Sequence, residues 1–321
     1  MTRRLSAAAG ALAVLGIGLG ALHGCNATSG GLIPRLPVQI GGAARDGGGP
    51  MFFTTRQGWQ VELDQAVFAV GPFYFNTQPP GSQGLQVGTV IVQVTSQSFV
   101  NALDPSLQEV DGGGSGESGA AASVEVDLFP PGCSAGGPSG NDACSTNGAA
   151  IDAYESLIDE PPPFFLENGG LASGSSAFVA GTASQADAGL VVPFYGFLTI
   201  DTSTGGNPND PAASPLTSLQ QVAGACPCAG GCGAASGCSL VFPASPSVLQ
   251  IRVDPTHLFD AVDFAALIPP PDAGPAWSPD AGPLTWNTKG PDSAFNTELV
   301  EGGLQASNGV YLFNVVEQPS N

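Results

Sequence analysis

The chain has 321 residues, of which seven are Lys or Arg and 27 are Asp or Glu, so its formal net charge is −20 at pH 7. Nucleic-acid binding depends on clustered cations that release counterions from the phosphates, and this acidic chain with its scattered basic residues excludes that class. With 46 Gly, 29 Pro and 42% hydrophobic residues, the composition predicts a folded core joined by long glycine-rich loops.

The N-terminus has the pattern of an export signal. A positive start at residues 3–4 precedes an apolar run over residues 7–22. A run of about 16 residues is short for a permanent membrane helix, but it suits the core of a cleaved signal. We therefore expect residues 1–24 to be a signal peptide, with Sec or twin-arginine export both open.

The signal closes with Leu22-His23-Gly24-Cys25. This tetrapeptide resembles the lipobox of bacterial lipoproteins. The resemblance implies that Cys25 becomes the lipidated first residue, with palmitate among its acyl chains, and that the lipid holds the protein on a membrane of the cell envelope. The residue after the cysteine is Asn26, which under the sorting rule of that family favours an outer-membrane lipoprotein, on either the periplasmic or the surface face.

Residues 25–50 are rich in Gly, Ala and Pro, and we expect them to be a flexible tether. Residues 51–321 then form a single domain. Short runs with alternating or β-branched apolar residues predict strands at 59–64, 66–75, 87–94, 123–129, 178–183, 190–200, 239–242, 248–253 and 310–316. Gly71-Pro72 interrupts the second run and predicts a bulge or bend there.

Helix signals are few. An amphipathic stretch over residues 151–158 ends at a triple proline, and Asp254-Pro255 is typical of a cap and first turn, opening a helix that runs to Ala266. Many short strands with one or two short helices predict an all-β fold, an antiparallel β-sandwich with long Gly/Pro-rich loops. A barrel is the alternative.

Six cysteines remain when Cys25 is set apart, an even number that predicts three disulfides in an exported chain. They lie in two loop insertions, at about residues 130–146 and 224–240: Cys133, Cys144, Cys226, Cys228, Cys232 and Cys238. Cys226 and Cys228 are too close in sequence to pair with each other. Separately, we expect Cys133–Cys144 as a local staple of the first insertion. The remaining four pair either as 226–238 with 228–232 or as 226–232 with 228–238. A metal site in this cysteine cluster is the rival, but no histidine lies nearby, and we expect no metal and no cofactor.

One histidine, His257, remains after signal removal. Together with Asp254 and Asp260 it would share one helical face, but a surface histidine near a helix start is the expectation. Gly132-Cys133-Ser134-Ala135-Gly136 matches the Gly-x-Ser-x-Gly pattern of a hydrolase elbow, and an extracytoplasmic serine hydrolase using Ser134 and His257 is the alternative function. A loop, not a helix, follows the serine, so we expect a non-enzyme.

Two loop clusters contain oxygen ligands that calcium prefers. They are Asp104 with Glu109 and Asp111, and Asp201 with Asn207 and Asp210; neither has the spacing of a calcium loop, so we expect solvated carboxylates. Aromatic residues of the strands are expected in the core: Trp59, Phe73, Tyr74, Phe75, Phe194, Tyr195 and Phe197. Trp277 and Trp286 in a proline-rich stretch are the better candidates for an exposed contact.

The segments Gly58-Trp59-Gln60-Val61 and 251–255 resemble uncharacterised lipoproteins of high-GC Gram-negative bacteria, a resemblance that carries no activity. The sequence thus predicts a lipid-anchored, non-enzymatic binding or interaction module of the cell envelope. Its protein or glycan partner is open, and a purely structural envelope protein is a further alternative.

Overall fold

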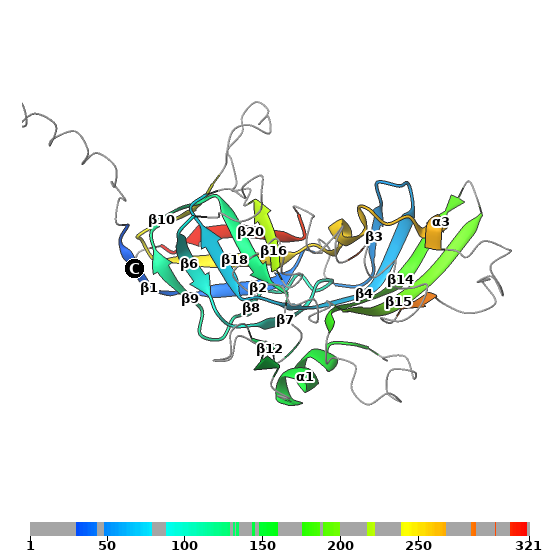
Figure 1. The fold of residues 1–321 in the computed structure, drawn as a ribbon, viewed down its shortest axis with the longest axis horizontal. Helices are drawn as coiled ribbons and strands as arrows, with labels where there is room; N and C mark the ends of the chain where they lie inside the picture. The colour runs from blue at the N-terminus through cyan, green and yellow to red at the C-terminus, as the bar shows by residue number, and fades with distance from the viewer. Residues whose placement is uncertain are drawn as a thin grey trace, which may run out of the picture.

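The computed structural model describes residues 30–43, 48–78, 88–128, 131, 133–134, 143–144, 148–159, 175–186, 189–199, 217–221, 239–267, 284–286, 299 and 309–319. The predicted all-β, sandwich-like class is confirmed, because strands account for most of this described part (Figure 1). Helices there are short: α1 (Gly148–Glu155), the 3-10 helix η3 (Pro255–Phe259) and α3 (Phe264–Leu267). No helix in the described ranges is long and apolar enough to cross a membrane.

Three larger sheets make up the described fold. The first has the order β1 (Leu32–Leu36), β9 (Gly114–Glu117), β6 (Val90–Val94), β5 (Phe73–Asn76), β11 (Ser123–Asp127) and β16 (Thr217–Gln221). The second has the order β20 (Tyr311–Glu317), β18 (Ser247–Val253), β2 (Val38–Gly42) and β8 (Gln108–Glu109). The third has the order β19 (Leu284–Trp286), β15 (Leu190–Thr199), β14 (Ser175–Gln185), β4 (Gln60–Val70) and β3 (Met51–Thr54), with β7 (Ser98–Asn101) also on β4. Two small ribbons are β10 (Gly119–Ala121) with β17 (Leu240–Phe242), and β12 (Cys133–Ser134) with β13 (Ala143–Cys144).

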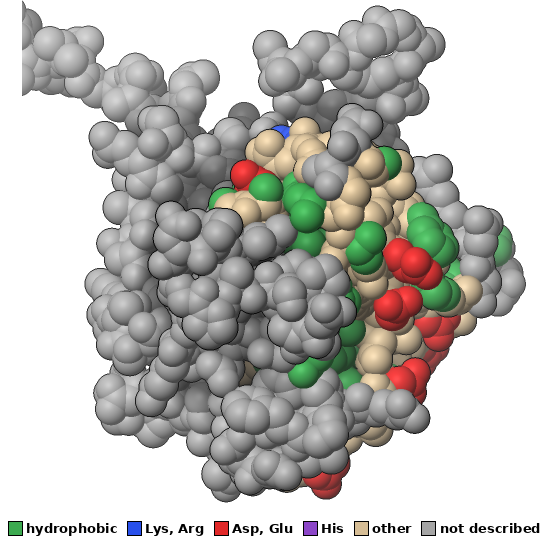
Figure 2. All heavy atoms as spheres, turned by 90° about the vertical axis from the view of Figure 1, so that its right-hand side faces the viewer, with side chains coloured by type: hydrophobic (Ala, Val, Ile, Leu, Met, Phe, Trp, Pro, Cys, Tyr) green, Lys and Arg blue, Asp and Glu red, His purple; other side chains and the backbone are tan. Residues whose placement is uncertain are grey.

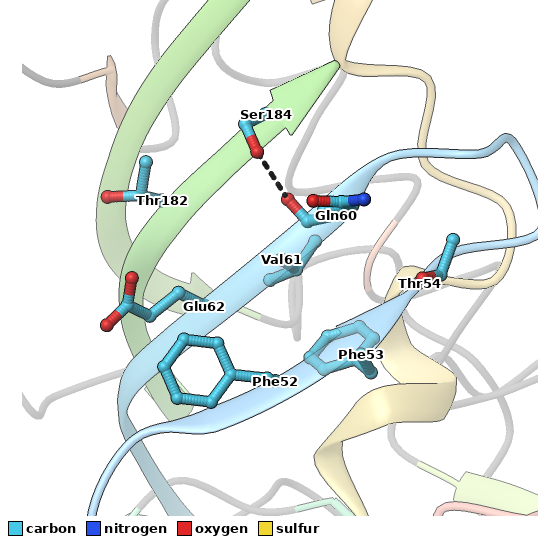
Figure 3. Close-up of a pocket in the computed structure, with 8 residues that line it drawn as sticks. All are labelled: Phe52, Phe53, Thr54, Gln60, Val61, Glu62, Thr182 and Ser184. Atoms are coloured by element: carbon cyan, nitrogen blue, oxygen red, sulfur yellow. Dashed lines mark hydrogen bonds between the residues drawn. The ribbon is translucent and has the colours of Figure 1, made fainter. Parts of the chain in front are cut away.

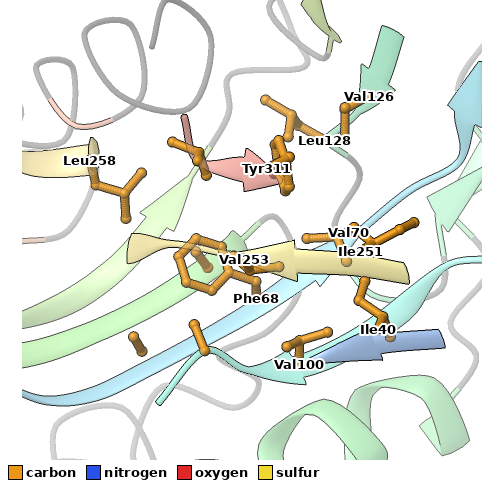
Figure 4. Packing of buried hydrophobic residues seen from close by; sticks show 14 of the residues in the cluster. Ile40, Phe68, Val70, Val100, Val126, Leu128, Ile251, Val253, Leu258 and Tyr311 are labelled. Atoms are coloured by element: carbon orange, nitrogen blue, oxygen red, sulfur yellow. The ribbon is translucent and has the colours of Figure 1, made fainter. Parts of the chain in front are cut away.

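The pairing is antiparallel with two exceptions among the described strands, since β18 runs parallel to β2 and β15 runs parallel to β19. The main core lies where the sheets face one another. Figure 4 shows Ile40 of β2, Phe68 of β4 and Ile251 of β18 converging in it, and each is fully buried. This burial of alternate residues from several sheets is what a sandwich needs.

The chain passes from one sheet to another at Gly71-Pro72, where the sequence predicts a bulge or bend. Strand β4 ends at Val70 in the third sheet, and β5 begins at Phe73 in the first. Gly71 has φ +88°, and a side chain there would meet the Phe73 ring and the Ser96 carbonyl oxygen. Only glycine tolerates this backbone without strain, so the change of sheet is set locally.

The prediction of a flexible tether over residues 25–50 is wrong for residues 32–42. These residues form β1 and β2, and β2 is an inner strand of its sheet, between β18 and β8. Its backbone approaches a neighbour closely, because a side chain at Gly42 would overlap the Ala102 carbonyl group. The glycines that suggested flexibility therefore allow close packing instead.

The helix predicted from Asp254 to Ala266 begins as expected but is divided. The Asp254 side chain accepts a hydrogen bond from the Thr256 backbone N–H at 3.0 Å and caps η3. The 3-10 helix ends at Phe259, and the Asp263 side chain, which accepts from the Ala265 N–H at 3.0 Å, begins α3. A second capping carboxylate thus starts a second helix.

Candidate functional site

One face of the third sheet is turned away from the main core, and α1 covers part of it. Tyr154 of α1 is fully buried there, with its hydroxyl 3.5 Å from the Val67 carbonyl oxygen. It packs in a separate apolar cluster with Val67, Phe178 and Phe197 from β4, β14 and β15. Residues 66–70 of β4 are buried on both faces of the sheet, by the main core on one face and by this second cluster on the other. This burial explains why the run is continuously apolar.

Beyond α1 the same face continues toward β3 and is solvent-accessible. We call it the open face and define it as Phe52 and Thr54 of β3, Gln60 and Glu62 of β4, and Thr182 and Ser184 of β14. The strand register aligns these side chains in two rows, because Phe52 pairs with Glu62 and Glu62 with Thr182, while Thr54 pairs with Gln60 and Gln60 with Ser184. Residues directly opposite on one face of a sheet have neighbouring side chains, so the rows are contiguous.

The open face is hollowed, with a volume of about 350 Å³. Figure 3 shows Phe52 and Glu62 projecting to the same side, next to Thr182. Phe52 is 70% exposed, which is high for so large an apolar side chain. The Ser184 hydroxyl donates to the Gln60 carbonyl oxygen at 3.5 Å, and this bond helps to fix the orientation of the hydroxyl group. The surface therefore combines an aromatic ring, a carboxylate, an amide and hydroxyl groups.

The β3–β4 hairpin that carries Phe52 is fixed to the rest of the fold. Its turn is closed by the Thr55 N–H, which donates to the Trp59 carbonyl oxygen at 2.8 Å. On the inner side the Phe53 ring lies 5.5 Å from the Phe259 ring of η3. Arg56 pairs with Asp260 at 3.0 Å. The open face is thus held in place before any ligand arrives.

Acidic side chains lie beside this surface. Glu62 belongs to the open face, and Asp64, two residues further along β4, is also exposed. Figure 2 shows acidic side chains following one another down this end of the molecule between hydrophobic ones. Basic side chains, coloured blue in Figure 2, are visible in this view near the top of the described surface. The described surface at this end therefore favours cationic ligands.

His257 lies on η3, at the opposite face of the third sheet from α1. Its Nδ1 is 3.0 Å from the Asp260 carboxylate, which also contacts Arg56. Its ring packs so closely on the backbone of Gly309 that a side chain at 309 would overlap it. Asp254 caps η3 and does not join the histidine. His257 lies near a helix start as expected, but its side chain is only 34% exposed and is paired with Asp260.

The structure does not bring Ser134 and His257 together. Ser134 lies in β12, which Figure 1 shows on the α1 side of the molecule, whereas η3 packs against Phe194 on the other face of β15. In β12 and β13 the backbone register places Cys133 directly opposite Cys144. Opposed residues of an antiparallel pair have Cα atoms about 4.5–5.5 Å apart, within the range that a disulfide needs.

The other candidate residues have the following positions. Asp104 accepts hydrogen bonds from Ser106, first from its backbone N–H at 2.9 Å, and these bonds lower the pKa of its carboxyl. In the described part of the chain no three His, Cys, Asp or Glu side chains are close enough together to hold a metal ion. Asp104, Glu109 and Asp111 therefore do not form a metal site. Outside the described residues lie Cys25, Asp201, Asn207, Asp210, Cys226, Cys228, Cys232, Cys238 and Trp277, together with the side chain of Trp286.

The aromatic residues expected in the core are buried there in the main. Trp59, Phe73, Phe75, Phe194 and Phe197 are each at most 4% exposed. Tyr74 and Tyr195, in contrast, are half-buried. Burial, followed by the charges of Asp127 and Glu125, raises the pKa of Tyr74.

Sequence reasoning missed the open face. Met51–Thr54 is a four-residue strand after a glycine run, too short to show a period, and the sequence pattern does not single out Phe52. The alternation in residues 60–64 was a usable signal, since it predicted one exposed face for β4. The strand pairing that adds Thr182, Ser184 and Phe52 to that face is not encoded locally.

No protein-family model matches this chain, and no curated protein does. Among solved structures, the chain is similar to MbnP from Methylosinus trichosporium with a TM-score of 0.28 and 14% sequence identity, over 88% of this chain and 97% of that one. A TM-score and an identity this low assign the chain to no family.

Proposed function

We propose that this chain is a lipid-anchored, non-enzymatic binding module of the cell envelope that holds its partner on the open face. The observation that carries the proposal is a pre-ordered surface with a 70% exposed phenylalanine at its edge and polar groups across it. Aromatic residues are enriched in protein–protein interfaces, where polar groups surround them at the rim.

The position of the surface supports this role. Strand β1, which follows the proposed lipid attachment at Cys25, lies at one end of the molecule, and the tips of β3, β14 and β15 lie at the other (Figure 1). A protein held through Cys25 would therefore present the open face away from its anchor. The separation of Ser134 from His257 favours binding over serine hydrolysis.

Site-specific photocrosslinking in intact cells tests the binding role. We expect p-benzoylphenylalanine in place of Phe52 to form a discrete adduct. The matched control replaces Val241, which is 58% exposed on β17. Strand β17 pairs with β10, which Figure 1 shows near the β1 end. Adducts at both positions or at neither would refute the open face as the binding surface.

The anchor is tested separately by Cys25→Ser. We expect this variant to leave the membrane fraction while its thermal unfolding stays as in wild type, because the substitution removes only the lipid. Retention of the variant in the membrane fraction would refute the lipid anchor without affecting the crosslinking result.

A further inference from the structure

Strand β3 is an edge strand with backbone groups that remain available for hydrogen bonding. In an antiparallel pair, residues bond their partner alternately. The bond from the Thr55 N–H to the Trp59 carbonyl oxygen sets the phase, so Phe53 and Met51 bond β4, while Phe52 and Thr54 direct their N–H and C=O groups away from it. No described residue bonds these outward groups.

From this geometry we propose that the edge of β3 binds an extended, basic peptide segment of a partner as an additional strand. The inference rests on the proposed function and names the class of partner. The N–H and C=O groups of Phe52 and Thr54 supply four backbone hydrogen bonds to the added strand. Strand addition to an exposed edge is a general mode of peptide recognition, in which backbone bonds give affinity and side-chain contacts give specificity.

The charge of the open face selects a basic segment. An added strand lies about 4.8 Å beyond β3, so its residue opposite Phe52 is about two strand spacings from Glu62. A Lys or Arg side chain at that position extends over the Phe52 ring and directs its charge toward the Glu62 carboxylate, because the two side chains project to the same side (Figure 3). The contact combines a cation–π interaction with a charge pair.

The edge is ready for such a strand. Phe53 and Arg56 fix the hairpin to η3 through Phe259 and Asp260. The ordering cost on this side of the complex is therefore small. A second copy of the chain is disfavoured as the occupant, since each copy has a net charge of −20 and would place Glu62 and Asp64 near their own counterparts.

The test is fluorescence anisotropy with the purified full-length chain and a labelled, capped hexapeptide of alternating arginine and threonine. The control peptides alternate glutamate and threonine, or contain arginine and threonine with N-methylated amides on the pairing edge. We expect saturable binding of the basic peptide alone, weakening as salt is added because charge pairs at a surface are screened.

Three variants separate the backbone from the charge. Thr54→Pro removes an outward N–H that β4 does not use and should weaken binding about tenfold or more. Thr54→Val keeps the N–H and removes only the hydroxyl group, so it should keep most of the binding that Thr54→Pro loses. Glu62→Gln should weaken binding several-fold at low salt and little at high salt. Its matched control is Glu117→Gln on β9, which should have no effect, and thermal unfolding checks that each variant is folded.

Several results would overturn the inference. One is that the basic and acidic peptides bind equally well, and another is that the basic peptide does not bind at all. A third is that Thr54→Pro binds the basic peptide as well as wild type does. A wild-type dimer that Thr54→Pro dissociates would assign the edge to a second copy and overturn the basic-peptide assignment. If the crosslinked adduct at Phe52 forms equally in Thr54→Pro cells, the proposed function stands and the strand-addition inference fails.

Discussion

Two neighbouring phenylalanines separate stability from binding. Phe52 and Phe53 are adjacent in β3, so their side chains point to opposite faces. Phe52 is 70% exposed, and the half-buried Phe53 packs 5.5 Å from Phe259. Replacing each with alanine removes the same atoms from two different environments, and each variant is the control for the other.

The magnitudes follow from burial. A Phe side chain buries about 150–200 Å² when fully enclosed. Phe52 is 70% exposed and therefore buries less than a third of this area. At about 25 cal/mol per Å², Phe52→Ala should lower the free energy of unfolding by about 1 kcal/mol. Phe53→Ala loses most of its contact area and the aromatic pair with Phe259, and we expect a loss of about 2–3 kcal/mol, below the range for fully buried Phe→Ala changes. For a domain of this size, these losses of unfolding free energy correspond to a fall in Tm of about 4–8 °C for Phe53→Ala and of at most a few degrees for Phe52→Ala.

Differential scanning calorimetry and peptide binding by anisotropy measure the two effects. Phe52→Ala should bind the basic peptide at least several-fold more weakly at a near wild-type Tm. Phe53→Ala, measured well below its Tm, should keep most of the binding. If Phe52→Ala unfolds as readily as Phe53→Ala, the side chain is part of the core and the argument for the open face fails.

Three further predictions concern the rest of the fold. Burial raises the pKa of Glu125 above its ordinary value of 4.5, so the folded state loses stability as pH rises from that value through the raised pKa; Glu125→Gln should therefore raise Tm more at pH 7 than at pH 4, and an equal gain at both pH values would contradict this cause. Gly181→Ala on β14 would push a side chain into a backbone carbonyl oxygen of β4 and should cost about 1–3 kcal/mol by denaturant unfolding, whereas Gly148→Ala, with open space around it, should be neutral or stabilising. Non-reducing peptide mass mapping should find Cys133 joined to Cys144, and finding both as free thiols would disprove the staple.

Much of the fold class was accessible from the sequence, because strand periodicity is a local property. Alternation over residues 60–64 and the continuous apolar run that follows corresponded to one open and one covered half of β4. Asp254 before Pro255 marked the start of η3, because the capping bond joins residues only two positions apart, Asp254 and Thr256. The disulfide arithmetic and the lipobox also needed only the order of residues, and they remain predictions.

Composition alone misled the interpretation of residues 32–42. Glycine and proline indicate flexibility when nothing packs against them, and no local pattern reveals that Gly42 lies against the Ala102 carbonyl group. The same limitation applied to the separation of Ser134 from His257, since a serine motif and a histidine in the right order say nothing about their distance.

The sequence by itself determined an acidic, strand-rich chain with an N-terminal segment that resembles a lipoprotein signal, since charge, periodicity and short motifs are sums or patterns along the chain. Only the tertiary structure decided which surface remains open. Phe52, Glu62 and Thr182 come from three strands and become neighbours through the register of β3, β4 and β14. Register depends on long-range pairing and on which face the core buries, and for that reason the candidate binding surface was not visible before the strands were assembled.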